Sequence, residues 1–538
     1  MAFGIRPSVI GRPGLRRRAV VAVAVVAGLL SAQPMTAARA AATLHEAEAA
    51  TISQGVVDSD HAGFTGSGFV NYDNLVGSYV DFTLTPAQSG QVRLVLRYAN
   101  GTTADRPMRI TVNGAQLAPG LSFPGTGSWT TWRTVTVQAT LHTGANTVRA
   151  TATTAGGGPN LDSLTVDDGA QGGTDWSKAV VDSTMARLTP ASLGGWDYTR
   201  GLYLWGQYLV WQRTGEARYL QYIRDWADRF VDASGNIGQS FNNLDNMQAG
   251  NVLLALYRET GQARYRTAAT KIRTRLNTYP RTADGGWWHA TSDSRQGQLW
   301  GDGVYMVDPF LARYGAWVAG DSFTLAEPAK QIEVYWSHLR RTSGAAAGLL
   351  YHAYDEPGGL TASWAQPSLG GTNGISWCRA MGWFGMATVD ILETIPADHP
   401  RRAALIGILR DLVPAYARWQ DPASGRWFQV VTEPGNASNW TETSCSAMYT
   451  YTISRSVERG YVDASYRANA DLGYRGVLAK VSLGADGRSN IVDISEGTNA
   501  SASLGFYFGR ARPVNDFHGL GAFLIMNEQL SRVGPGPT

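Results

Sequence analysis

The sequence of 538 residues predicts a protein of two folded parts, an N-terminal β-sandwich of the jelly-roll type and a C-terminal all-α (α/α)6 barrel. Three observations predict this architecture. Short runs that alternate apolar and polar residues come first, a polar, glycine-rich segment follows, and helical periodicity then continues to the end of the chain. Hydrophobic residues make up 44% of the chain and charged residues 17%, a balance typical of packed globular domains.

The first 40 residues have the pattern of a secretory signal. An arginine-rich start precedes the apolar segment Ala19–Leu30, and the small residues of Ala38–Ala40 form a cleavage site. A membrane anchor is the alternative, but this apolar segment is short for a bilayer span. We therefore predict a signal peptide over residues 1–40 and a secreted protein without membrane attachment after its removal.

The charge of the mature chain excludes one class of partner. The whole sequence has a formal net charge of +3, and residues 1–40 carry six arginines and no acidic residue. The secreted part is therefore mildly acidic, so nucleic-acid binding has no electrostatic support. The 18 Trp and 23 Tyr residues suit stacking on sugar rings as well as core packing. We expect a monomer.

Residues 41–168 form the predicted β-sandwich. Runs such as "SYVDFTLT", "QVRLVLRYA" and "WRTVTVQATL" alternate apolar and polar side chains, and Gly, Asn and Pro separate the runs at strand-and-turn spacing. Helical periodicity is missing from this region, which favours two packed antiparallel sheets. The polar, glycine-rich residues 169–175 indicate a linker.

Residues 176–538 contain a helical repeat. The motif T-G-x-A-R-Y occurs at Thr214–Tyr219 and at Thr260–Tyr265, each time where glycine ends one helical segment and a second begins. An aromatic segment follows, and a new helix then starts. About six such units fit between Trp176 and Leu530, and helical hairpins that need a neighbour to bury their faces can close into a ring.

The segment "GQLWGDGVYMVDPF" raises the question of what an acid does at the start of an apolar helix. Asp302 stands directly before the helical run. An Asp in this place is ordinarily an N-cap. The alternative is a reacting group whose apolar surroundings tune its proton affinity.

The ring favours the second interpretation, because the N-termini of its inner helices gather at one end. Residues from several units fall at such helix starts or in the matching aromatic segments: Asp245, His289, Asp302, His352, Arg379 and Glu442. Side chains of these types that converge on one rim form a pocket, and helix N-termini suit an anionic ligand. We therefore include Asp245 and His289 among the substrate-binding candidates.

The helical part resembles glycoside hydrolase family 105, the unsaturated rhamnogalacturonyl hydrolases. The likeness rests on four segments taken in order: "WGDGVYMVDPF", "YHAYDE", "WCRAMGWFGMA" and "ETSCSAMYTYTISRSVERGY". It implies an (α/α)6 barrel, in agreement with the repeat, and Asp302 as the catalytic residue. It also implies sugar contacts at Trp300, His352, Trp377, Arg379 and Trp383. Cys378 departs from the family, which usually has a small residue there.

The resemblance also implies a reaction that needs one acid. The family's substrate carries a C4=C5 double bond in a terminal uronic acid left by a polysaccharide lyase. A carboxyl group that protonates C4 can then draw a proton from the water that adds at C5. Asp302 must be protonated at the start, and Asp245 or Glu442 is a possible assistant. Trp300 and Asp245 would raise its pKa, whereas the helix N-terminus and Arg379 would lower it.

We therefore expect a secreted hydrolase of unsaturated rhamnogalacturonan oligosaccharides, with plant cell-wall polysaccharide as the source of its substrate. Arg379 is expected to hold the substrate carboxylate with its planar guanidinium; a structural salt bridge is the alternative. No catalytic cofactor is expected. Two other functions stay open, an unsaturated glucuronyl hydrolase and a non-catalytic sugar-binding protein.

The β part resembles a family 35 carbohydrate-binding module. The likeness rests on "HEAEAA", "LRYANG", "GSWTTW", "LHTGANTVR" and "PNLDSLTV". It implies a structural calcium ion held by Glu46, Glu48 and Asp162, since a hard cation prefers carboxylate oxygens. A solvated strand edge is the alternative. Candidate sugar contacts are Arg97, Asn100, Trp129 and Asn160, although Trp129 suits a core position equally well.

The chain has two cysteines, Cys378 and Cys445. Both stand at the start of an inner helix in successive hairpins, which predicts that they are neighbours around the ring. Disulfides persist in exported proteins, so we predict a bridge between them. The alternative is two buried free thiols that fill apolar gaps.

Overall fold

The structure is a computed structural model, and it describes residues 43–86, 90–167, 175–358 and 362–533. The predicted signal peptide and nearly all of the predicted linker lie outside these residues. Asp175, the last linker residue, is described. It caps the first helix, since its side chain accepts a hydrogen bond from the backbone N–H of Lys178. No helix among the described residues is both long enough and apolar enough to cross a membrane.

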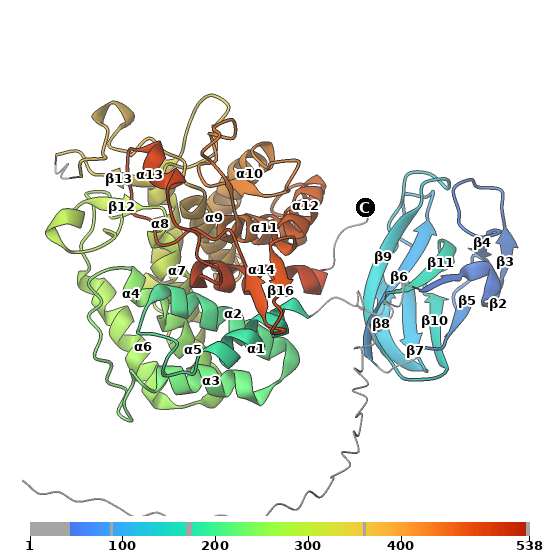
Figure 1. The fold of residues 1–538 in the computed structure, drawn as a ribbon. Coiled ribbons are helices and arrows are strands. Elements are labelled where there is room, and N and C mark those ends of the chain that lie inside the picture. The colour runs from blue at the N-terminus through green and yellow to red at the C-terminus, as the bar shows by residue number, and fades with distance from the viewer. Residues whose placement is uncertain (1–42, 87–89, 168–174, 359–361, 534–538) are drawn as a thin grey trace, which may run out of the picture.

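The N-terminal part is a sandwich of two antiparallel sheets (Figure 1). One sheet has the order β3-β4-β11-β6-β9 with β1 paired to β11, and the other has the order β2-β5-β10-β7-β8. The strands span β1 Thr43–Glu46, β2 Thr51–Ser53, β3 Gly55–Asp58, β4 Phe69–Tyr72, β5 Tyr79–Leu84, β6 Gly90–Ala99, β7 Met108–Val112, β8 Ala115–Leu121, β9 Arg133–Leu141, β10 Asn146–Ala152 and β11 Asn160–Asp167.

The core of the sandwich comes from the alternation seen in the sequence. Leu94 and Leu96 of β6 and Val80 and Phe82 of β5 are buried, whereas the residues between them are more exposed. Strand side chains alternate between the two faces of a sheet, so each strand gives one apolar face to the interior. The predicted β-sandwich is confirmed.

The C-terminal part is a closed ring of helical hairpins. The inner helices are α2 Tyr198–Thr214, α5 Gly250–Thr260, α7 Gly303–Trp317, α9 Cys378–Leu392, α11 Thr443–Glu458 and α14 Phe517–Val533. The outer helices are α1 Trp176–Arg187, α3 Ala217–Ala227, α6 Ala263–Arg275, α8 Ser322–Leu339, α10 Arg402–Arg418 and α12 Arg467–Leu478. Two short helices lie outside this scheme, α4 Asp245–Gln248 and α13 Leu504–Phe508.

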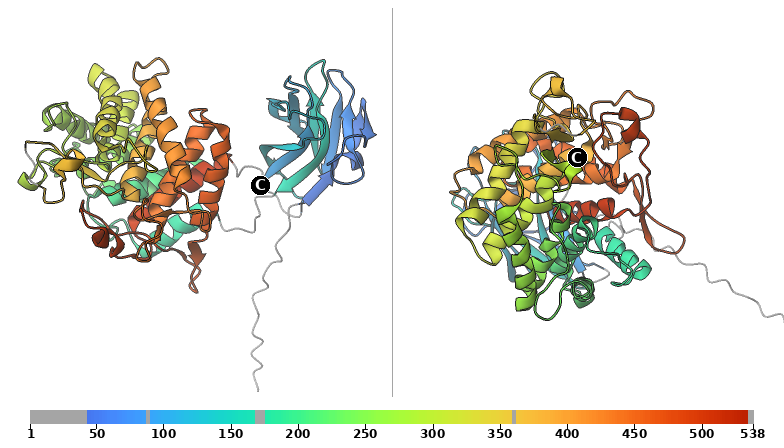
Figure 2. Two further views of the ribbon diagram at one scale, coloured as in Figure 1. Left: turned by 90° about the horizontal axis from the view of Figure 1, so that it is seen from above. Right: turned by 90° about the vertical axis from the view of Figure 1, so that its left-hand side faces the viewer.

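Contacts between the ends of the chain close the ring. Each inner helix packs against the next, and α14 packs against both α11 and α2. The outer partner of α14 is α1, so one hairpin combines the first and the last helix of the domain. Figure 2 shows these green and red segments side by side. The predicted (α/α)6 barrel is confirmed.

The repeated T-G motif ends the inner helices as predicted. Gly215 and Gly261 are the C-terminal caps of α2 and α5, with φ angles of 69° and 66°. A residue with a Cβ atom adopts this left-handed conformation only at a cost. The glycines therefore stop the inner helices at the end of the ring opposite the candidate site and let the chain turn back into the outer helices.

Candidate active site

Asp302 occupies the N-cap position of α7 but does not cap the helix. Its side chain accepts no hydrogen bond from the helix N-terminus. Instead its Oδ2 atom faces Nε2 of His352 at 3.3 Å, and neither atom has a well-aligned hydrogen-bond partner. The capping interpretation of Asp302 is therefore wrong, and the carboxylate stays available to a ligand.

A two-stranded sheet brings His352 to this carboxylate. Strand β12, Gln298–Trp300, pairs with β13, Ala353–Asp355, in a register that sets Trp300 opposite Ala353. His352 precedes β13 and is fully buried. Its Nδ1 atom lies 2.8 Å from the hydroxyl of Tyr507, which holds the ring so that Nε2 points at Asp302.

Asp245 and His289 form a second acid–imidazole pair in the same site. Asp245 is the first residue of α4, and its Oδ2 atom lies 3.8 Å from Nε2 of His289. The His289 ring stacks on Trp300 with a centroid distance of 4.5 Å and an angle of 5° between the planes. Trp300 thus joins the Asp245 pair to the strand that leads to Asp302.

The two carboxyl groups differ in proton affinity. Burial raises the pKa of Asp245 to about 7, and the charges of Asp302 and Asp197 add to this rise. Burial also acts on Asp302, but the adjacent His352, together with His289 and Arg379, holds the pKa of Asp302 below its usual range. Near neutral pH about half of the Asp245 side chains therefore carry a proton, whereas Asp302 is a carboxylate.

This result corrects one requirement of the sequence-based mechanism. That mechanism needs a protonated Asp302, whereas His352 stabilises the ionised form of Asp302 in the free site. The histidine next to Asp245 does not supply a charge either. Burial lowers the pKa of His289 to about 4, so its imidazole is neutral at pH 7.

Glu442 is a structural residue and not a partner of Asp302. It is fully buried, and it caps α11 by accepting a hydrogen bond of 2.6 Å from the backbone N–H of Cys445. Its other oxygen accepts from the backbone N–H of Ser495 at 2.9 Å. The carboxylate is therefore fully used in joining α11 to the loop that follows residue 492.

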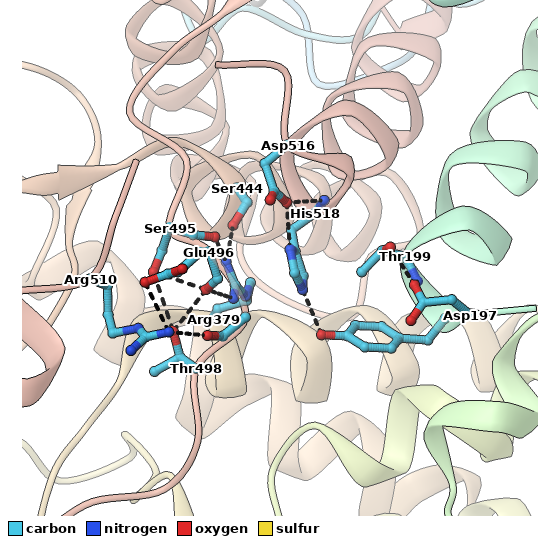
Figure 3. A network of polar contacts seen from close by, with 12 residues as sticks. Asp197, Thr199, Arg379, Ser444, Ser495, Glu496, Thr498, Arg510, Asp516 and His518 are labelled. Carbon is cyan, nitrogen blue, oxygen red and sulfur yellow. Dashed lines mark hydrogen bonds and ion pairs between the residues drawn. The ribbon is translucent and has the colours of Figure 1, made fainter. Parts of the chain in front are cut away.

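Arg379 does not have the role that the sequence predicts. It is 1% exposed and donates to the backbone carbonyls of Ser495 at 2.5 Å and Glu496 at 2.7 Å. Figure 3 shows the guanidinium inside this network of polar contacts. Two of its nitrogens are committed to main-chain oxygens, so the expected grip on a substrate carboxylate is wrong; Arg379 fixes the loop beside the site.

The three predicted tryptophans are packed rather than open. Trp300, Trp377 and Trp383 are 4%, 1% and 1% exposed. Trp377 donates its indole N–H to Gln429 and packs 4.4 Å from the His352 ring, and Trp383 stacks on Tyr305. They form the walls that hold the polar groups, and their burial favours a core position over a stacking platform for Trp377 and Trp383.

The sequence analysis did not identify a chain of hydrogen-bonded side chains near Asp245 and Asp302. Nδ1 of His518 lies 2.6 Å from Oδ1 of Asp516, and Nε2 of His518 lies 2.6 Å from the hydroxyl of Tyr198 (Figure 3). Tyr198 begins α2 and His518 stands in the first turn of α14. Both obey the helix-start rule that selected Asp245 and Asp302, so that rule applied to every hairpin would have found them.

The inner-helix cysteines are also neighbours. Cys378 and Cys445 are joined in a disulfide, with their Cα atoms 5.7 Å apart, and this is the pairing that the sequence predicts. The bridge ties the start of α9 to the start of α11. It lies next to Trp377 and Arg379, and so it stabilises the wall behind His352.

The predicted calcium residues of the β-sandwich gather around one loop. Thr65 donates to Glu46 and to Asp162, and the backbone N–H of Ser67 donates to Glu48. One oxygen of Glu48 is buried without a partner, and burial, with the charges of Glu48 and Asp162, raises the pKa of Glu46. These features suit a hard cation.

The spread of these ligands does not yet match a coordination sphere. Oxygens from the three residues do not all lie within 4.8 Å of one another in the described part of the chain. Arg97 also competes for one of them, because its Nη1 atom lies 2.5 Å from Oδ2 of Asp162. The calcium site therefore stays a prediction, and its residues have the right chemistry for it.

Two of the candidate sugar contacts in the sandwich have structural partners instead. Asn100 is fully buried, and its amide nitrogen donates to the carbonyls of Ala104 and Phe123, so its selection is wrong. Arg97 is engaged by Asp162 and by the carbonyl of Gly63. Asn160 is 3% exposed. Trp129 is half-buried, like Arg97, and stacks on His61 at 6.0 Å.

Residues 176–533 match the sequence model described as Glycosyl Hydrolase Family 88. The chain belongs to this family. A solved structure of a glycoside hydrolase from family 105 of C. acetobutylicum ATCC 824 is 31% identical and covers 67% of this chain and 100% of its own, with a TM-score of 0.62. The resemblance to family 105 is therefore confirmed, and with it the barrel of this family 88 domain.

A curated relative of the family 88 domain has a named activity. The unsaturated rhamnogalacturonyl hydrolase YesR of Bacillus subtilis is 26% identical over 273 residues, which is 50% of this chain and 73% of that protein. The first three curated relatives match over only 116 to 122 residues, and the chain spans 12% to 19% of their length.

The β-sandwich resembles the family 35 carbohydrate-binding modules. A native family 35 carbohydrate-binding module from Clostridium thermocellum is 47% identical and covers 24% of this chain and 98% of its own, with a TM-score of 0.23. Residues 80–166 also match a model described as Alpha-galactosidase, CBM13 domain.

Proposed function

We propose that this protein is a secreted hydrolase that removes the terminal 4,5-unsaturated galacturonic acid from rhamnogalacturonan oligosaccharides. The observation that carries the proposal is the pair of partly buried carboxyl groups in one site, Asp245 with its pKa raised to about 7 and Asp302 with its pKa lowered. Two titratable groups whose environments separate their pKa values supply an acid and a base at one pH. Family membership and the activity of the Bacillus subtilis relative support the choice of substrate.

The first chemical step uses the proton on Asp245. Transfer of this proton to C4 of the unsaturated sugar moves the electron pair of the C4=C5 bond into the new C–H bond. The positive charge that develops at C5 is shared with the ring oxygen. A carboxyl group with a pKa of about 7 suits this transfer, because half of it is protonated at neutral pH and its proton is more acidic than that of water.

The second step uses the carboxylate of Asp302. A water molecule adds to C5 and gives one proton to Asp302, so the charge at C5 is neutralised and a hemiketal forms. The bond between C5 and the ring oxygen then breaks as the proton of the C5 hydroxyl moves to the ring oxygen, which leaves a ketone at C5 and a hemiacetal at C1. The hemiacetal hydroxyl gives its proton to the departing oxygen, so an aldehyde forms at C1 and the neighbouring sugar leaves as an alcohol. The proton on Asp302 returns through water to Asp245, which restores both carboxyl groups. Nε2 of His352, 3.3 Å from the receiving carboxylate, keeps Asp302 ionised until the water arrives.

One assay tests the proposal. The double bond absorbs ultraviolet light, so hydration is followed as loss of absorbance with purified lyase products. The unsaturated galacturonyl-rhamnose disaccharide is expected to be turned over faster than an unsaturated glucuronyl disaccharide. The reverse preference would support the glucuronyl alternative, and no turnover of any lyase product would support the non-catalytic sugar-binding alternative.

The N-terminal module extends the proposal to the polymer. A family 35 module that is 43% identical and covers 92% of its own chain has been solved in complex with a glucuronic acid containing disaccharide, with a TM-score of 0.22. On that identity we infer that the module of this protein binds uronic-acid glycans of the plant cell wall and needs calcium for its stability. Export through the signal at residues 1–40 would place both parts on the same extracellular substrate.

A further inference from the structure

Arg295 lies at the edge of the candidate site. It ends the short 3-10 turn Asp293–Arg295, three residues before β12 begins. Its guanidinium carbon is 4.3 Å from the centroid of the Trp300 ring, the same ring on which His289 stacks. One of its terminal nitrogens donates to the side-chain oxygen of Asn499 at 3.3 Å. These contacts hold the guanidinium beside the groups that react.

Among the described residues, this cation has no carboxylate within ion-pair distance. The other cations near the site are occupied, because Arg379 donates to two backbone carbonyls and Arg510 pairs with Glu496 at 2.9 Å. An arginine presents five N–H donors, and the one contact with Asn499 leaves the others free.

The negative charge of the site means that a substrate carboxylate needs a cation to bind it. Asp302 is ionised, Asp245 is half ionised near neutral pH, and His289 is neutral. A substrate that itself carries a carboxylate is repelled by these acids unless a cation meets it. Arg295 acts electrostatically on both Asp245 and His289, so it is close enough to influence the reacting end of the substrate.

We propose that Arg295 binds the carboxylate of the terminal unsaturated sugar, with Trp300 and Asn499 holding the guanidinium in place. This inference rests on the proposed function and supplies the group that recognises the uronate. The planar guanidinium matches a carboxylate with two parallel N–H···O bonds, and a ring beneath it keeps the plane fixed. Arg295 thus takes the role that the sequence assigned to Arg379.

The position also predicts an effect on Asp245 that a purely structural arginine would not have. A nearby positive charge favours the ionised form of an acid, and Arg295 lowers the pKa of Asp245 in this way. Removal of the charge must therefore shift the basic limb of the pH–rate profile to higher pH. A loss of packing alone would lower the rate without moving that limb.

The test compares wild type, Arg295→Gln and Arg295→Lys on the unsaturated galacturonyl-rhamnose disaccharide and on its methyl ester, which lacks the negative charge. A charge-assisted pair is typically worth a factor of about 10–100 in KM. We expect Arg295→Gln to raise KM for the free acid by about that factor and to leave KM for the ester nearly unchanged, with Arg295→Lys between them. Arg266→Ala is the matched control, because Arg266 is an exposed arginine on α6 that touches Tyr257 and no acid.

The outcomes separate this inference from the proposed function. If wild type hydrates no unsaturated uronide, the proposed function is wrong, and the proposed role of Arg295 is then wrong as well. If wild type is active and Arg295→Gln has the same KM for the free acid and the same basic limb, the inference about Arg295 is wrong while the function stands. Circular dichroism confirms folding, and Arg295→Lys keeps the test decisive if the glutamine variant does not fold.

Discussion

Asp302 and His352 face each other across 3.3 Å, with Oδ2 of the acid opposite Nε2 of the imidazole, and both atoms are buried. Asp302 stands where a helix N-cap belongs and yet gives its oxygens to the interior of the barrel. An N-cap that leaves the helix amides to other partners gives up roughly 1 kcal/mol of stability. A buried polar pair without saturated hydrogen bonds is costly as well, which is typical of a site that a ligand completes.

Replacement of Asp302 by Asn should nearly abolish turnover. The amide cannot accept the proton of the attacking water, and loss of a positioned acid or base commonly costs at least ~10²–10⁴-fold. Rate measurements at saturating disaccharide check this. Asp308→Asn on the same helix is the control, since Asp308 is buried, has a pKa raised by burial, and has no hydrogen-bond partner for either oxygen. A folded Asp302→Asn variant with most of its activity would return Asp302 to a structural role.

The raised pKa of Asp245 predicts that the stability of the protein depends on pH. Its folded pKa, raised to about 7, lies above the ordinary value of 3.8. The folded state therefore binds this proton more tightly than the unfolded state, and the stabilisation is lost as pH rises through 7. Asn at this position cannot ionise, so the melting temperature of Asp245→Asn relative to wild type should rise between pH 4 and pH 7 and stay constant above pH 8. A difference that does not change with pH would contradict the raised pKa.

The fold followed from the sequence because its signals are local. The alternation in β5 and β6 and the T-G stops at Gly215 and Gly261 are each set by a few neighbouring residues, and the structure keeps all of them. The positions of Asp302 and His352 are also set locally, since Asp302 follows β12 at the start of α7 and His352 directly precedes β13. The pairing of α1 with α14 was not visible, because it joins the two ends of the domain.

The direction of buried side chains did not follow from the sequence. The two carbonyls that bind Arg379 belong to residues 116 and 117 positions later, in a loop without periodicity. Trp377 occupies a helix start as predicted, but its contact with Gln429 turns it into the wall. The order of the two carboxyl pKa values depends on His352 and Asp197, whose distances no sequence pattern contains.

Arg379 and Arg295 should therefore respond differently to mutation. Arg379→Ala leaves the buried carbonyl of Ser495 without its donor, and an unsatisfied buried group of this kind costs about 1–3 kcal/mol. The carbonyl of Glu496 loses one donor but keeps the hydroxyl of Thr498 at 2.8 Å. We expect a lower melting temperature. We also expect kcat to fall by the same factor for the free acid and for the methyl ester. Calorimetry and the two substrates measure this. A selective rise in KM for the free acid would show that Arg379 contacts the substrate carboxylate after all.

The disulfide should be present in the exported protein. Cys378 and Cys445 are 67 residues apart, and the chain-entropy estimate for a loop of this size is roughly 4 kcal/mol. Intact mass after unfolding and alkylation without reductant should show no modified cysteine, and reduction should add two labels and lower the melting temperature. Two labels without reductant would rule the bridge out.

Calcium should control the stability of the N-terminal module. Without a cation, burial and the charges of Glu48 and Asp162 raise the pKa of Glu46, so the folded module loses stability as pH rises through that raised pKa. A bound calcium ion would favour the carboxylate form of Glu46, so the calcium-bound module would instead lose stability as pH falls. Calorimetry of the full chain should show one unfolding transition whose temperature falls on chelation at pH 7 and recovers with added calcium. In Glu46→Gln this transition should no longer respond to either treatment.

Asp60→Asn is the control, because Asp60 is an exposed acid of the same module, with a side chain that is 63% accessible and lies close to His61. A melting curve that changes with neither chelator nor calcium would contradict a calcium site at Glu46, Glu48 and Asp162.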